Sequence, residues 1–160
     1  MLERLLPGLG HLQNIHPLFV HFPIALLLTA ALFYLIAWIG GHDAIKWTAF
    51  WVLMLGTISA AAAVATGLYA GPGVMISESV REHLLRHHMQ IMIATSVLTG
   101  VLAIWAIAAR PMPMRGRVIF MLGLLAIVML ISIGADVGSE MVYGYNAGGD
   151  ACPQPIELNH

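Results

Sequence analysis

HPLFVHFPIALLL, residues 16–28, begins an apolar segment and places two histidines, His16 and His21, in its first turns. A neutral imidazole keeps one hydrogen-bond donor and one acceptor, and lipid can satisfy neither of them. A histidine inside an apolar helix should therefore face the protein interior and find a partner there. The stretch predicts both the start of a membrane-spanning helix and a polar site inside the fold.

The composition of the whole chain supports a membrane protein. Of its 160 residues, 59% are hydrophobic and 9% are charged, whereas a soluble domain has about 25% charged residues. Four long windows are nearly free of charge, at roughly residues 17–39, 47–69, 89–109 and 118–133. A spanning helix needs about 20 apolar residues, so the fourth window must run on towards Val137. We predict an all-α integral membrane protein, an up-and-down four-helix bundle over residues 16–140.

The two ends of the chain lie outside this bundle. Residues 1–15 carry leucines at helix-like intervals interrupted by Pro7 and Gly8, which predicts either a short interfacial helix or a loose N-terminal segment. Residues 141–160 form a C-terminal tail. The single cysteine, Cys152, excludes an internal disulfide framework and a thiolate metal cluster. The net charge of −1, without a basic patch, argues against nucleic acid as a partner.

Basic residues near the helix ends predict the orientation. Four of them fall in the loops 40–46 and 110–117, and three fall on the opposite side, spread over a longer length of chain. Cytoplasmic loops carry the excess of Lys and Arg, so both termini should be extracytoplasmic in the inner (cell) membrane. The histidines of the first and third helices then share the outer side, and only His42 lies inside.

A second group of histidines lies in ESVREHLLRHHMQ, residues 78–90, which contains His83, His87 and His88. Ser79 and Glu82 have the spacing of a capping box, which predicts that the third helix begins near Val80. In an up-and-down bundle the first and third helices are diagonal neighbours, so each can present an imidazole to the same central space.

The spacing around the histidines suggests which of them face inward. Behind His88, a seam with small polar groups continues through Met92, Thr95 and Thr99, so Thr95 should line the same interior. His21 has Ala25 and Thr29 beneath it, which predicts room on that face.

A haem iron accepts two axial imidazoles on opposite faces of the porphyrin. We therefore predict haem b held by His21 and His88 as the first choice, and by His16 with His87 or His83 as the second.

Other interpretations of the same histidines remain open. His16 before Pro17 also suits a helix end, and His83 suits an exposed interfacial position. Adjacent His87 and His88 cannot both point inward, because neighbouring helical positions differ by about 100°. A copper or zinc site built from His16, His21, His87 and His88 is the alternative cofactor site. An accessory structural subunit of a larger membrane complex is the alternative function.

At the level of motifs, HPLFVHFPIALLL resembles the opening helix of a four-helix membrane family, domain of unknown function 2231. An HP pair precedes an FP pair by six positions in that family, as His16–Pro17 and Phe22–Pro23 do here. HHMQIMIATSVL, residues 87–98, is similar to the third helix of the family, with His88 as the aligned histidine. GADVGSEMVYGYNAG, residues 134–148, is similar to its closing segment, although Val137 replaces the first glycine of a pair.

The resemblance implies an electron-transfer role. Members of the family are suspected of binding haem, and some are fused to c-type cytochrome domains. By that resemblance, the chain is expected to be a b-type haem subunit rather than a self-contained enzyme. Its expected partners are membrane lipid, quinone or an outward-facing c-type cytochrome, and other membrane subunits or a second copy of the chain.

Overall fold

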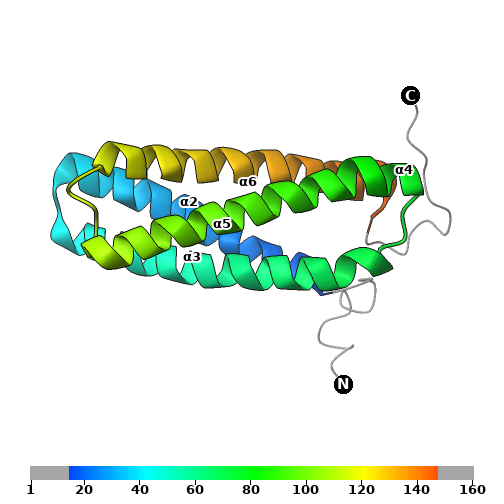
Figure 1. Ribbon diagram of the computed structural model, residues 1–160, viewed down its shortest axis with the longest axis horizontal. Helices are drawn as coiled ribbons and strands as arrows, with labels where there is room; N and C mark the ends of the chain where they lie inside the picture. The colour runs from blue at the N-terminus through cyan, green and yellow to red at the C-terminus, as the bar shows by residue number, and fades with distance from the viewer. Residues whose placement is uncertain (1–14, 148–160) are drawn as a thin grey trace, which may run out of the picture.

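The computed structural model describes residues 15–147, and within them it contains helices and no strands. Four long helices form the molecule: α2 (His16–Gly40), α3 (Asp43–Ala70), α5 (Arg86–Ala109) and α6 (Arg117–Tyr145) (Figure 1). Three short elements join α3 to α5, namely η2 (Gly71–Gly73), α4 (Glu78–Val80) and η3 (Arg81–Leu85). Each long helix, alone or with the adjoining short elements, is long and apolar enough to cross a membrane, which confirms the predicted fold class.

The helices are arranged as two antiparallel hairpins. In one hairpin α2 packs against α3, and in the other α5 packs against α6. The hairpins meet through α3 with α5 and α2 with α6, which places α2 and α5 diagonally across the bundle. This is the arrangement that the sequence predicted for the two histidine-bearing helices.

Local sequence explains the ends of α2 and α6. Pro17 lies in the first turn of α2, where the missing N–H costs no hydrogen bond, and Gly41 ends the helix with φ 71°. Gly116, with φ 73°, precedes α6. The last helix continues past residue 140 to Tyr145, so the fourth window does extend beyond Val137, as a full span requires.

The predicted capping box at Ser79 is wrong, because the capping residue lies two positions earlier in the chain. The capping residue is Ser77, whose hydroxyl accepts a hydrogen bond from the Val80 N–H at 3.4 Å. Ser77 has the extended backbone that a cap needs, whereas Ser79 is already inside α4 and bonds to the Ser77 hydroxyl at 3.0 Å. The helical run therefore begins at Glu78.

A π-helical turn, η3, lies between α4 and α5 and was not predicted. Such a turn contains one residue more than an α-helical turn and so changes which positions face inward. Val80 is fully buried in front of it, whereas Arg81 reaches the carbonyls of Gly71 at 3.0 Å and Val74 at 2.7 Å. The arginine thereby ties the α3–α4 connection to the start of the third span.

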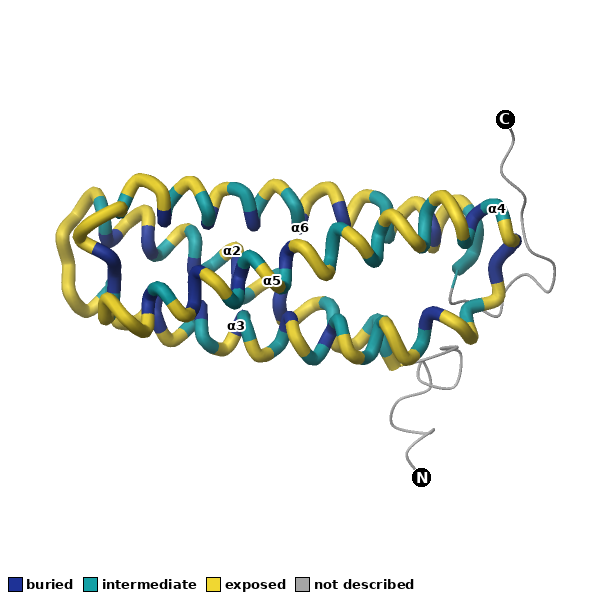
Figure 2. Tube along the Cα trace, viewed as in Figure 1, coloured by how far each residue is buried: buried dark blue, intermediate teal, exposed yellow. Residues whose placement is uncertain are grey.

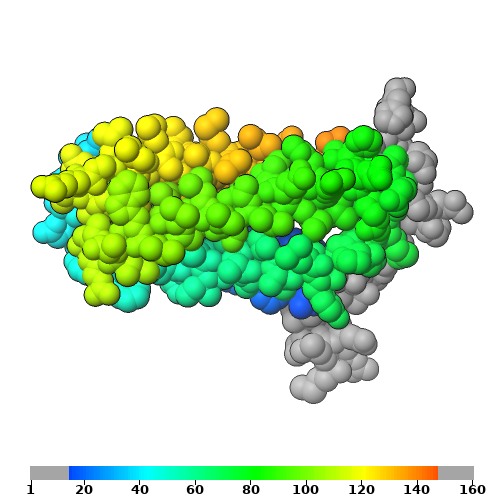
Figure 3. Space-filling view, viewed as in Figure 1, coloured from blue at the N-terminus to red at the C-terminus, as the bar shows by residue number. Residues whose placement is uncertain are grey.

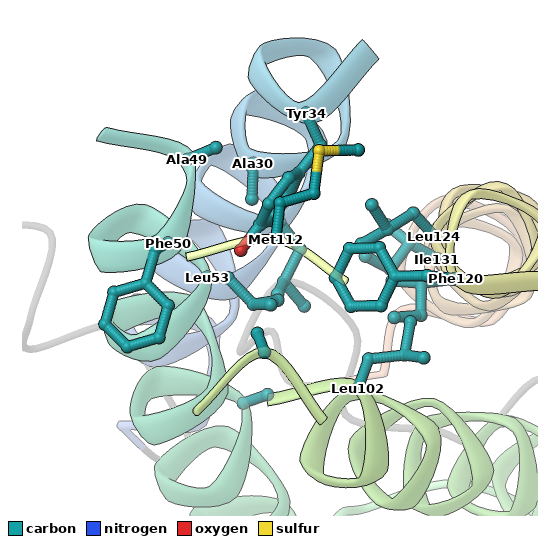
Figure 4. Packing of buried hydrophobic residues seen from close by; sticks show 14 residues of the cluster. Ala30, Tyr34, Ala49, Phe50, Leu53, Leu102, Met112, Phe120, Leu124 and Ile131 are labelled. Atoms are coloured by element: carbon teal, nitrogen blue, oxygen red, sulfur yellow. The ribbon is translucent and has the colours of Figure 1, made fainter. Parts of the chain in front are cut away.

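The hydrophobic core is concentrated at the end of the bundle that carries the two short interhelical connections (Figure 4). Tyr34 and Phe120 meet edge to face with ring centroids 5.0 Å apart, and the Tyr34 hydroxyl donates to the Pro111 carbonyl at 2.9 Å. Buried positions follow the inner side of the helices (Figure 2). The two hairpins diverge towards the opposite end, where α2 and α5 begin (Figure 1). The bundle thus has a packed end and an open end.

Leu124 and Leu122 offer a matched test of this core. Leu124 is 1% exposed and Leu122 is 58% exposed on the same helix. Leu124→Ala should lower the free energy of unfolding by about 2 kcal/mol, the lower end of the range for buried leucines, because lipid rather than water surrounds the protein. Leu122→Ala should have a much smaller effect. Thermal unfolding in detergent followed by circular dichroism measures both, and equal losses would contradict this packing.

Candidate functional site

A cavity of about 380 Å³ lies between the four long helices at the open end of the bundle. Its volume is within the range of about 300–1,000 Å³ that is usual for small-molecule sites. The wall is mostly aliphatic or small, and three imidazoles contribute to it, those of His16, His21 and His88. We call this space the histidine cavity.

His16 is oriented by the neighbouring helix of its own hairpin. Its Nδ1 lies 3.0 Å from the hydroxyl oxygen of Thr66 on α3. That hydroxyl also lies 3.0 Å from the Ala63 carbonyl, to which it can donate, and it can then accept from the histidine. In this arrangement His16 donates from Nδ1, and the lone pair of the neutral ring is on Nε2.

His88 is oriented in the same way by the other hairpin. Its Nδ1 lies 2.9 Å from the backbone carbonyl of Gly134 on α6. A carbonyl can only accept, so His88 also donates from Nδ1 and carries its lone pair on Nε2. Metal-ligating histidines commonly donate their second ring nitrogen to a carbonyl in this manner, which fixes both tautomer and ring orientation.

Glycines make room for both imidazoles. A Cβ atom on Gly67 of α3 would lie 2.9 Å from the His16 Cε1, and one on Gly138 of α6 would lie 3.2 Å from the His88 Cε1. Each hairpin thus packs one histidine of its first helix against a glycine of its second. The two rings approach from diagonal helices and line the same cavity.

His21 has a more peripheral position than the sequence suggested. It is exposed at the rim of the cavity, and its Nδ1 donates to the Pro17 carbonyl one turn back at 2.7 Å. The expectation that Ala25 lies on an inward face below it is wrong, because Ala25 is exposed. The helical period instead turns Pro23 and Leu27 towards the core.

The other predicted site residues differ in whether they line the histidine cavity. Thr95 is 4% exposed and lines the cavity, which confirms the inward seam below His88, and its hydroxyl donates to the Ile91 carbonyl at 2.7 Å. His83 and His87 are exposed and do not line the cavity. The rotation of about 100° per residue explains why His88 faces inward and its neighbour does not. His11, His160 and Cys152 lie outside the described residues.

Between residues 15 and 147, no three side chains of the His, Cys, Asp and Glu types come together as a metal-binding group. The set His16, His21, His87 and His88 is therefore not assembled as one tetrahedral cluster. Thr66, which orients His16, was not predicted. A signal for it existed, because Thr66 directly precedes Gly67, the last of a series of small residues spaced three or four apart in α3, namely Gly56, Ala60, Ala63 and Gly67.

A comparison with known families agrees with the fold. The model of a family described as "Predicted membrane protein (DUF2231)" matches residues 12–151. The chain belongs to this family. No curated protein and no solved structure matches it. Membership confirms the resemblance inferred from the first-helix motif, and the four spanning helices of this DUF2231 protein agree with the family's description.

The tautomers of His16 and His88 can be tested directly. In ¹⁵N-histidine NMR spectra of the protein at neutral pH, both rings should be protonated at Nδ1 rather than at Nε2.

Gly138→Ala should displace the His88 ring and weaken its bond to Gly134, because the added Cβ comes within 3.2 Å of the ring. Gly100→Ala is the control, since nothing lies within 4 Å of its added Cβ. An Nε2–H tautomer for His88 in the unsubstituted protein would contradict the assignment.

Proposed function

We propose that this DUF2231 protein is a b-type haem subunit that transfers electrons within the membrane. One observation carries the proposal: His16 and His88, on diagonal helices, line one cavity, and each ring is held at its Nδ1 by a group on the other helix of its hairpin. Two imidazoles supplied by different helices are a standard axial ligand set for haem iron.

The surroundings of the two rings fit a flat, mostly apolar group. Aliphatic and small residues form most of the cavity wall, and Gly67 and Gly138 leave space beside the imidazoles. His16 and His88 are therefore the proposed ligands. His21 at the rim replaces His16 in the alternative pair.

Each part of the chain would have a defined role around the bound group. Haem supplies one-electron oxidation and reduction when it is bound. Thr66 and the Gly134 carbonyl hold the two rings in position, and the packed end of the bundle closes the site on one side. With the basic loops in the cytoplasm, the cavity faces the outer side of the inner membrane. Its electrons would then pass between quinone and an outward-facing c-type cytochrome or another membrane subunit.

Copper is the second candidate, because a thioether accompanies the histidines. The Met92 side chain packs against Gly134, the residue whose carbonyl accepts from His88. Imidazole and thioether ligands together favour copper(I). Zinc has no comparable support, because it is usually held by four ligands of the His, Cys and carboxylate types.

Haem binding can be tested with neighbouring histidines on the same helix. His88→Ala and His16→Ala should each abolish or strongly reduce the haem absorption of protein expressed with ample haem. His87→Ala should keep it, because His87 is exposed and does not line the cavity. A pyridine haemochrome assay gives the haem content, and circular dichroism shows whether each variant has folded.

The outcomes separate the candidates. A colourless protein without bound metal would contradict both proposals, and a colourless protein that binds one copper ion per chain would favour the second. Equal loss of haem from the His87 and His88 variants would contradict the assigned ligands.

Thr66 provides a separate test of how His16 is positioned. Thr66→Val removes the acceptor for the His16 N–H, and loss of such a partner typically costs about 10–100-fold in affinity for the bound group. Thr66→Ser should restore the affinity. Thr57→Val is the control on the same helix, because the Thr57 hydroxyl bonds only within its helix, to the Leu53 carbonyl. Haem titration measures all three, and a valine variant that binds normally would contradict a positioning role.

A further inference from the structure

A second hollow, of about 540 Å³, lies on the flank of the bundle between the end of α3 and the start of α5. Figure 3 shows the surface hollowed between these helices at the open end of the molecule. The hollow opens sideways between two membrane-spanning helices, so a ligand that enters it can come from the lipid phase. We call it the lateral hollow.

The lateral hollow and the histidine cavity share part of their walls. Leu68, Gly71, Leu85, Met89 and Ile93 line both spaces. Gly71 contributes no side chain to this shared wall, and the Met89 sulfur would lie 3.7 Å from a Cβ added there. A molecule in the lateral hollow would therefore be separated from the contents of the histidine cavity by roughly one layer of side chains.

The polar groups of the lateral hollow favour a neutral ligand with hydrogen-bond acceptors. Arg86 and Gln90 lie on α5, are exposed and can donate, and the described residues that line the hollow include no carboxylate. Arg81 also lines it, but both of its terminal nitrogens donate to backbone carbonyls. One exposed cation and one amide suit the carbonyl oxygens of a quinone ring better than a phosphate group, which would favour several cations.

We propose that the lateral hollow binds the head group of an isoprenoid quinone, with its ring against the apolar wall and its carbonyl oxygens towards Arg86 and Gln90. The isoprenoid tail would leave between α3 and α5 into the lipid. The position rests on the geometry of the hollow, and its role as electron donor or acceptor rests on the proposed haem function.

Binding of decylubiquinone to the purified full-length protein in phosphatidylcholine nanodiscs tests the proposal. Gln90→Trp should fill the hollow and raise the Kd at least tenfold. Arg86→Leu should raise it about tenfold, the effect of losing one charge-assisted hydrogen bond. Arg115→Ala, in the connection at the opposite end of the bundle, is the control and should leave the Kd unchanged.

The readout separates this inference from the proposed haem function, because haem content is measured on the same samples. A Gln90→Trp variant that keeps its haem but loses quinone binding supports a quinone site in the lateral hollow. Quinone binding that is sensitive to Gln90→Trp in a protein without haem also supports the hollow, although the haem proposal then fails. Absence of quinone binding in the haem-containing protein, or binding that Gln90→Trp does not change, overturns the inference. Displacement of the quinone by phosphatidylglycerol at equal concentration would overturn it in favour of an anionic lipid.

Discussion

The structure depends on how a lipid-embedded bundle satisfies the polar atoms of two imidazoles. Lipid offers no hydrogen-bond partners, so each ring N–H must find an acceptor within the protein. His16 uses the Thr66 hydroxyl and His88 uses the Gly134 carbonyl. Both hydrogen bonds are made at Nδ1, and both require a close approach between the two helices of one hairpin. Gly67 and Gly138 permit that approach.

The two ends of the bundle differ in how the space between the hairpins is filled. At the end with the short connections, Tyr34, Phe120 and their neighbours fill the space between the hairpins. At the other end the hairpins diverge and leave a cavity, lined by imidazoles together with aliphatic and small residues. Arg81 and the π-helical turn hold the chain across this end without filling it. A packed end, together with an open end in which the imidazoles are held in fixed orientations, suits the binding of a prosthetic group.

The sequence was sufficient for the fold, because span length and composition decide how many helices cross a membrane. It also predicted correctly that His88 and Thr95 face the interior, because the seam of small polar residues that follows His88 has one inward direction. It misjudged His21, because α2 is apolar on every side and lipid-facing and core-facing positions have the same composition. The Thr66–His16 bond depends on how α2 packs against α3, and its one sequence signal was the position of Thr66 beside Gly67. The π-helical turn had no signal in the pattern of apolar residues.

Electron paramagnetic resonance of the oxidised, purified protein tests the central claim most directly, because the spectrum of ferric haem depends on its axial ligands. The account predicts a low-spin ferric signal of the type given by two imidazole ligands, lost on substitution of His88. A high-spin signal from haem with a single axial ligand, or no haem signal from folded protein, would contradict two histidines converging on one group.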